Sequence, residues 1–100
     1  MTGNPDLTVM VKLASILARH TGNQKEIGYR LTGGDTLQSM LQDLDDRFPG
    51  IKTLIYTNDI DIVDSINVYV NGDNVRYLQG MKTPLKQGDV INIIPAAAAG

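Results

Sequence analysis

The end of the sequence carries its most distinctive chemical group, a glycine carboxylate that follows a run of small side chains. An apolar stretch at 90–94 leads into Pro95, and residues 96–100 read Ala-Ala-Ala-Ala-Gly. Small side chains bury little apolar surface, and Pro95 lacks a backbone N–H, so strand pairing is predicted to end there. Six extended residues reach about 20 Å, enough to thread a narrow channel. We therefore expect residues 95–100 to form a flexible tail that presents Gly100 to another protein; the alternative is an ordinary frayed terminus.

No set of residues in the sequence suits catalysis within the chain itself. Cysteine is absent and His20 is the only histidine, which leaves neither a thiol nor a credible zinc site. Asp59, Asp61 and Asp64 form an acidic stretch without the glycine and distal glutamate of a calcium loop. The serines have no histidine in a hydrolase-like context. We expect a protein that is not an enzyme and binds no metal or cofactor.

Length, charge and hydropathy limit the remaining classes. One hundred residues predict a single domain spanning 1–100. The net charge of −2 argues against nucleic acid as a partner. No apolar run approaches the roughly 18 residues of a membrane span, and the N-terminus lacks a signal-peptide pattern. The expected location is the cytoplasm, away from membranes.

The elements that must position the tail can be predicted from periodicity. Alternating apolar and polar residues indicate strands at 7–13, 27–31, 66–70 and 90–94, and a turn or brief helical piece at 14–20. Asn71-Gly72 favours a tight turn, after which residues 75–77 are predicted to pair back as a short strand. Residues 51–64 have no regular pattern, although Ile51, Leu54 and Ile55 are expected beneath the sheet.

One amphipathic helix is predicted between the second and third of these strands. Asp35 is the expected N-cap, with Gln38 as its capping-box partner, and Pro49-Gly50 ends the helix. One face carries apolar residues at helical spacing: Leu37, Met40, Leu41, Leu44 and Phe48. The order of elements predicts an α+β, β-grasp (ubiquitin-like) fold, a mixed sheet of about five strands with one main helix packed across it. Its first and last strands should lie side by side at the centre.

The last third of the chain resembles the MoaD/ThiS family of sulfur carrier proteins. The resemblance rests on residues 66–80, 85–90 and 93–96, and the stretch 75–77 is most similar to the branch linked to cysteine biosynthesis. It implies that an E1-like enzyme uses ATP to adenylate the terminal carboxylate at Gly100. Sulfur then replaces AMP to give a thiocarboxylate. A second enzyme, a cysteine synthase or the large subunit of a molybdopterin synthase, takes that sulfur.

The residues expected to meet these partners lie in the tail and in the stretch that leads to it. Ala97, Ala98 and Ala99 would be gripped by the E1-like enzyme. Arg76, with Lys82 and Lys86, could steer the chain to an acidic partner surface, or these could be ordinary solvated charges. Tyr77, if exposed, would suit a binding patch.

The chain departs from the family at its penultimate residue. The family ends in Gly-Gly, whereas this sequence ends in Ala99-Gly100. A Cβ at this position disfavours positive φ and adds bulk where an enzyme would close on the backbone. Three explanations stay open: the partners tolerate alanine, the sequence was altered, or activation is impaired.

Three other functions are compatible with the sequence. The chain could be the small subunit of a molybdopterin synthase, held permanently in a larger subunit. It could be a ubiquitin-like modifier joined through Gly100 to target lysines. It could also be a plain interaction domain with an inert tail.

Overall fold

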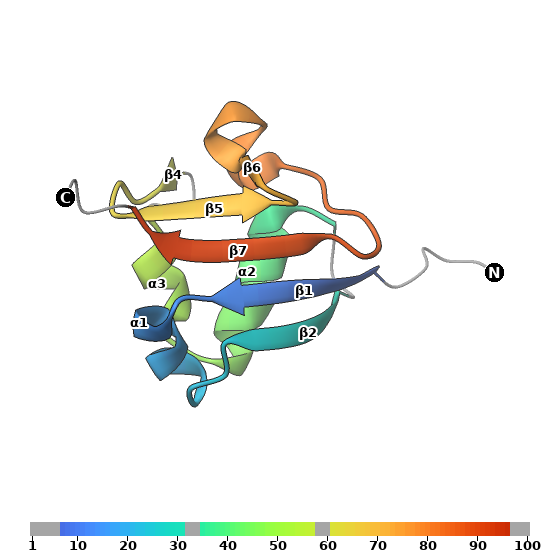
Figure 1. Cartoon of the computed structure of the whole chain (residues 1–100). Helices are drawn as coiled ribbons and strands as arrows, with labels where there is room; N and C mark the ends of the chain where they lie inside the picture. The colour runs from blue at the N-terminus through green and yellow to red at the C-terminus, as the bar shows by residue number, and fades with distance from the viewer. Residues whose placement is uncertain (1–6, 32–34, 58–60, 97–100) are drawn as a thin grey trace.

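The computed structural model describes residues 7–31, 35–57 and 61–96, with only the backbone of Thr57 and Asp61. A five-stranded sheet in the order β2-β1-β7-β5-β6 dominates it (Figure 1). The strands are β1 (Leu7–Leu13), β2 (Glu26–Leu31), β5 (Ile66–Val70), β6 (Asp73–Asn74) and β7 (Val90–Pro95).

The first and last strands lie side by side at the centre of the sheet, as predicted. β7 pairs parallel with β1, with Met10 opposite Val90 and Leu13 opposite Ile93. On its other side, β7 pairs antiparallel with β5. β1 and β2 form the predicted hairpin with a long connection, which contains α1 (Ser15–Ala18) and the 3-10 helix η1 (Arg19–Thr21). The mixed sheet and its crossing helix confirm the β-grasp prediction.

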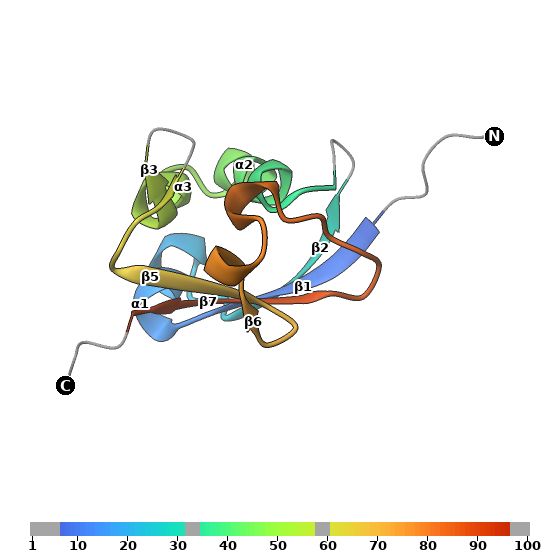
Figure 2. The same ribbon diagram turned by 90° about the horizontal axis from the view of Figure 1, so that it is seen from above.

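The main helix, α2 (Leu37–Arg47), crosses one face of this sheet, and the short helix α3 (Ile51–Ile55) lies on the same side (Figure 2). Four of the five apolar residues predicted for the inward face of α2 are completely buried among side chains of the core strands, whereas Phe48 is the C-cap and only partly buried. The completely buried residues include Leu37, Met40, Leu41, Leu44, Val11, Ile91 and Ile93. Each large apolar side chain buried in this way contributes about 1.5–3 kcal/mol relative to exposure. This layer is what holds β7, and so the base of the tail, in place.

The helix begins one residue later than predicted, so the proposed cap was wrong. Thr36 is the N-cap, and its hydroxyl oxygen accepts the N–H of Ser39 at 3.2 Å. Asp35 instead uses its carbonyl oxygen to accept the N–H of Leu85 at 2.6 Å. Ser39, rather than Gln38, therefore occupies the third helical position. The threonine wins because its side chain reaches the orphan N–H that a helix start leaves exposed.

The stretch after Gly50 is more regular than its sequence pattern suggested. Gly50 has φ of 103°, a value that favours glycine, and α3 follows it. The Asp45 carboxylate accepts the N–H groups of Gly50 and Lys52, each at 3.0 Å, so it caps α3 from the preceding helix. A small second sheet then forms between β3 (Tyr56–Thr57) and β4 (Asp61–Ile62).

The predicted turn at Asn71-Gly72 is present, but the short strand after it is not where it was expected. Asn71 and Gly72 both have positive φ, 52° and 91°, as a tight hairpin turn requires. The returning strand, β6, contains only Asp73–Asn74. Residues Val75–Tyr77 form the 3-10 helix η2, because the Asn74 side chain accepts the N–H of Arg76 at 2.9 Å and bends the chain. A further 3-10 helix, η3, spans Gly80–Lys82.

Within the part of the chain that the structure describes, no helix has the length and apolar character needed to cross a bilayer.

Candidate functional site at the end of β7

The base of the predicted tail is a continuation of the central strand. Pro95 does not end the pairing, as the sequence had suggested: it lies opposite Ile66 of β5. The N–H of Ala96 then donates to the carbonyl oxygen of Ser65 at 2.8 Å. Residues Ala97, Ala98, Ala99 and Gly100 lie outside the described residues, so their predicted roles stay predictions.

Pro95 is tolerated in this ladder because its nitrogen faces away from β5. The N–H groups of Asn71 and Ala96 mark where β5 and β7 exchange hydrogen bonds, and these bonds alternate along antiparallel strands. By that alternation the nitrogen of Pro95 points to the β1 side. There β1 has already ended, since Leu13 pairs with Ile93. The proline therefore removes no ladder bond.

Two exposed apolar side chains border this end of β7. Ile94 is 37% exposed on the strand itself, and Ile16 is 58% exposed on α1. The two segments meet where the N–H of Ala14 donates to the carbonyl oxygen of Ile93 at 3.1 Å. Ile16 was not among the residues predicted to meet partners, although a brief helical piece was one of the two predictions for 14–20. In the helix that forms, Leu17 and Ala18 take the buried side and Ile16 is left outside.

The structure brings Arg76 to the base of the tail through β5. Its guanidinium donates to the carbonyl oxygens of Val63 and Ile66, both at 2.9 Å, and to that of Ile62 at 3.5 Å. Ile66 is the residue that pairs with Pro95. Arg76 thus braces the connection between β4 and β5 that lies beside the tail, an internal role that the sequence did not suggest.

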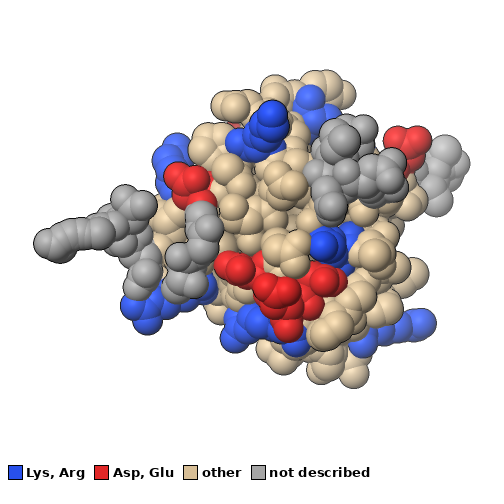
Figure 3. All heavy atoms as spheres, turned by 180° about the vertical axis from the view of Figure 1, so that it is seen from behind, with Lys and Arg blue, Asp and Glu red and all other residues tan. Residues whose placement is uncertain are grey.

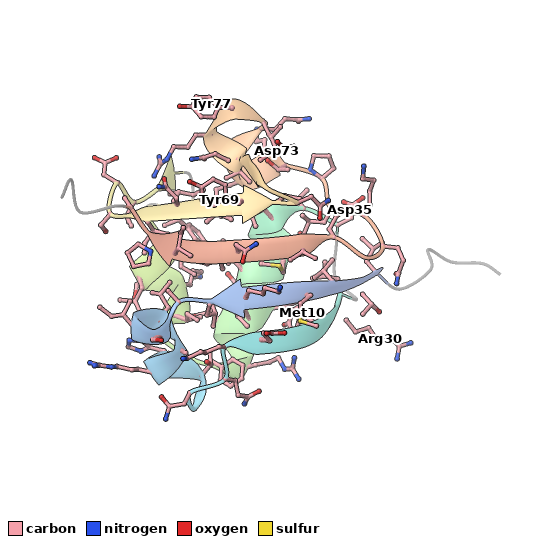
Figure 4. All side chains as sticks on the ribbon, viewed as in Figure 1. Met10, Arg30, Asp35, Tyr69, Asp73 and Tyr77 are labelled. Atoms are coloured by element: carbon pink, nitrogen blue, oxygen red, sulfur yellow. The ribbon has the colours of Figure 1, made fainter. Side chains whose placement is uncertain are left out.

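Tyr77 is 87% exposed and extends from η2 beyond β5 (Figure 4). With Tyr69, Leu78 and the turn residues 72–74 it lines a shallow hollow of about 480 Å³. Leu78 is 46% exposed. An exposed tyrosine beside an exposed leucine has the composition of a protein-binding patch, and the partner-binding role of Tyr77 stays a prediction.

The remaining candidates do not gather with these residues. Lys86 precedes β7, so the full length of that strand separates it from the tail, although it is close in sequence. Its N–H donates to the buried carboxylate of Asp89 at 2.7 Å, at the opposite end of the sheet. His20 is exposed on η1, as expected for a surface residue. Of the acidic stretch, Asp64 is exposed, Asp59 lies outside the described residues, and the Asp61 side chain is not described.

The described residues hold no group of three or more metal-ligating side chains. Of the described titratable groups, Tyr29 has a displaced pKa. It lies on β2, away from the tail, and burial is the main reason that its pKa is raised. The described side chains beside the end of β7 include Asp64 and Ser65, with Arg76 hydrogen-bonded to the same connection, and they form no metal-ligating group of three or more.

The described structure is a β-grasp domain whose central strand leads into the C-terminal segment. The sequence pattern of the ThiS family matches residues 14–100. The chain belongs to this family, and it is not an enzyme.

Individual relatives agree with this assignment. The sulfur carrier protein CysO of Mycobacterium tuberculosis is 33% identical over 96 residues, covering 94% of this chain and 100% of the relative. The small archaeal modifier protein 3 of Haloferax volcanii is 30% identical over 82% of this chain and 88% of its own length. In the crystal structure of the BexX/CysO complex of Amycolatopsis orientalis, one chain is 35% identical with a TM-score of 0.80, covering 92% of this chain and 99% of that chain.

Proposed function

We propose that this chain is a sulfur carrier whose terminal Gly100 carboxylate is activated and then converted to a thiocarboxylate. The observation that carries the proposal is its 33% identity with CysO across the whole length of that carrier. Support comes from the described structure, in which the central strand leads directly to the terminal segment.

The chemistry needs two steps, both performed by partners. A carboxylate is a poor electrophile, so an E1-like enzyme joins the Gly100 carboxylate to the α-phosphate of ATP and releases pyrophosphate. A sulfide equivalent then attacks the carbonyl carbon of the acyl-adenylate and displaces AMP, which leaves a thiocarboxylate. Ala97, Ala98 and Ala99 would be the segment that the E1-like enzyme grips, and their small side chains suit a narrow channel. The exposed Tyr77 would contribute to docking.

We propose that the sulfur is used in cysteine biosynthesis, because this chain is similar to the sulfur carrier CysO over 94% of its length. The sulfur acceptor would be a cysteine synthase. In Amycolatopsis orientalis a CysO chain was crystallised in complex with BexX, which supports a transferable carrier that visits partner proteins. Permanent residence in a molybdopterin synthase is the weaker alternative.

Intact-mass measurement tests the proposal. The full chain is incubated with ATP, the E1-like enzyme of its own organism and a sulfide donor. The expected product is heavier by the difference between one sulfur and one oxygen atom. A chain lacking Gly100 is the matched control and should stay unmodified. Absence of the heavier species, in a reaction where the enzyme modifies another carrier, would contradict sulfur carriage.

A second function, covalent modification of proteins, is favoured by the likeness to the small archaeal modifier protein 3. In that case Gly100 would form an amide with lysine side chains of targets, and ladders would appear on a denaturing gel. Such ladders, resistant to thiols and dependent on Gly100, would favour the modifier over the carrier. Formation of cysteine after addition of a cysteine synthase and an O-acylated serine, with hydrolysis returning the chain to its unmodified mass, would favour the carrier.

A further inference from the structure

The strand β2 forms an open edge of the sheet, and its hydrogen-bonding groups alternate in direction. Among the described strands, β2 pairs only with β1. The N–H of Leu13 donates to the carbonyl oxygen of Lys25 at 2.8 Å, which fixes the odd-numbered residues as those that bond to β1. The N–H and C=O groups of Glu26, Gly28 and Arg30 therefore point toward the open edge.

This edge is accessible. Glu26, Gly28 and Arg30 are exposed, and a groove of about 370 Å³ runs between β2 and α2. Gly28, Tyr29, Arg30, Asp43, Asp46 and Arg47 line it. Figure 3 views the molecule from the helix side, where acidic side chains gather over α2. Within the described residues, no further strand pairs with the outer edge of β2.

Gly28 lies at the middle of this edge, and neither its backbone conformation nor its neighbours within the chain require glycine there. A Cβ built there meets no atom within 4 Å, and Gly28 does not have the positive φ found at the turn glycines. Glycine within a strand costs about 0.5–1 kcal/mol relative to alanine. Strand glycines of this kind often mark the close approach of another backbone.

We propose that a second copy of this chain pairs with β2, antiparallel and two-fold symmetric about Gly28. In that register Gly28 lies opposite Gly28 of the second copy, and Glu26 lies opposite Arg30 of the second copy. By symmetry the Glu26–Arg30 pair occurs twice. Directly opposed residues on antiparallel strands project to the same face, where opposite charges stabilise the pairing.

The two charges also disfavour the symmetric registers centred on either charged residue. A two-fold axis at Glu26 would place glutamate against glutamate, and an axis at Arg30 would place arginine against arginine. Charged side chains commonly protect sheet edges from uncontrolled pairing. Registers centred on Ile27 or Tyr29 would place Glu26 or Arg30 opposite Gly28 and form no pair of opposite charges, so the register centred on Gly28 is the symmetric one that gains both Glu26–Arg30 pairs.

This dimer would leave the carrier end of the molecule uncovered. Both β2 and β1 lie between the added strand and β7, so the added strand is remote from Pro95 and Ala96. The proposal therefore does not depend on sulfur chemistry at Gly100, and each can fail without the other.

Charge reversal with sedimentation velocity, over micromolar to millimolar protein, tests the register. Glu26→Arg and Arg30→Glu each turn both opposed pairs into like charges, so each variant alone should dimerise at least about tenfold more weakly. An equimolar mixture of the two variants should form a heterodimer, because every opposed pair is again of opposite sign. The double variant should recover the wild-type dimer.

Matched controls separate this pairing from a change in net charge or a loss of folding. Asp64→Arg and Arg19→Glu make the same charge changes at exposed positions away from β2 and should leave association unchanged. Gly28→Pro removes an N–H that points outward, so it should abolish the dimer while the β1–β2 ladder and the circular dichroism persist.

A wild-type chain that stays monomeric at millimolar concentration would overturn the proposal. So would a mixture of the two charge-reversed variants that does not associate. If the free chain is monomeric and its β2 amide signals shift only on addition of the E1-like enzyme, the edge serves that partner and self-pairing is wrong.

Discussion

The guanidinium of Arg76 donates to the carbonyl oxygen of Ile66 at 2.9 Å, and Ile66 pairs with Pro95 at the end of the central strand. A single side chain from η2 thus holds the segment beside which β7 ends. The same guanidinium reaches the carbonyl oxygens of Val63 and Ile62, so its planar fork satisfies three backbone acceptors.

Replacing Arg76 with alanine should lower the free energy of unfolding by roughly 1–3 kcal/mol, because three carbonyl oxygens lose a charged donor. Urea denaturation measures this loss. Arg76→Lys should recover only part of it, since an ammonium group cannot reproduce the fork. If both variants unfold like the wild type, the contacts of Arg76 contribute nothing to stability, and docking becomes its better explanation.

The carboxylate of Asp89 is the second test. It is 5% exposed, and it accepts hydrogen bonds from the Asn71 amide at 2.8 Å and the Lys86 N–H at 2.7 Å. Asp89→Ala should cost about 1–3 kcal/mol, because both donors lose their acceptor. Thermal unfolding of both variants measures the effect, because Asp89→Ala removes both carboxylate oxygens and Asp89→Asn keeps one acceptor oxygen. If the wild type and both variants are equally stable, the Asp89 carboxylate does not stabilise the fold.

Tyr29 should make the protein less stable at alkaline pH. Burial is the main cause of its raised pKa; Asp43 raises the pKa further, and Arg47, 4.8 Å from the ring centroid, lowers it. The unfolded phenol ionises near the ordinary value of 10.0, whereas the folded one ionises later, so ionisation favours unfolding. Stability is therefore complete below the ordinary value and declines as the pH rises through the folded pKa.

The ionisation of Tyr29 is measured by titrating the near-ultraviolet absorbance of the wild type and of Tyr29→Phe. The difference between the two curves reports the Tyr29 phenol alone. Tyr29→Phe should also flatten the alkaline decline in unfolding free energy. Asp43→Asn should lower the pKa of Tyr29, because it removes a neighbouring negative charge. A Tyr29 that titrates at or below the ordinary value would contradict this.

Restoring glycine at the penultimate position should accelerate thiocarboxylate formation. Alanine in a left-handed conformation costs roughly 1–2 kcal/mol, so Ala99→Gly should raise the rate about tenfold where the E1-like enzyme requires positive φ. Single-turnover mass spectrometry measures the rate, with Ala98→Gly as the control. Equal rates for wild type and Ala99→Gly would show that the partners accept alanine.

Periodicity predicted most of what positions the tail. The alternation at 7–13 and 66–70 and the apolar stretch at 90–94 indicated the strands that carry the sheet, and Leu37, Met40, Leu41 and Leu44 indicated the face of α2 that covers it. These predictions were correct because a strand or helix with one buried face needs apolar residues at a regular spacing along the sequence. The Asn71-Gly72 turn succeeded for a local reason, since few residue pairs accept two positive φ values.

What the sequence could not predict depends on contacts between distant residues. Arg76 donates to backbone carbonyl oxygens in the segment 62–66. Every residue type carries such an oxygen, so the sequence does not show which ones an arginine will reach. The pairing of Ala96 with Ser65 likewise depends on how far β5 extends alongside β7, which composition does not record. The choice of Thr36 over Asp35 as N-cap was decided by the bridge between Thr36 and Pro84 and the bond from Leu85 to Asp35.

The central position of β7 has a mechanical consequence. Enzymes that pull on the chain beyond Ala96 would load this strand along its own axis. β7 is bonded to β1 on one side and to β5 on the other, so its hydrogen bonds bear such a load together in shear, instead of opening one at a time. If partners handle the chain by its C-terminal end, as we propose, it is anchored through a strand that is hydrogen-bonded on both sides.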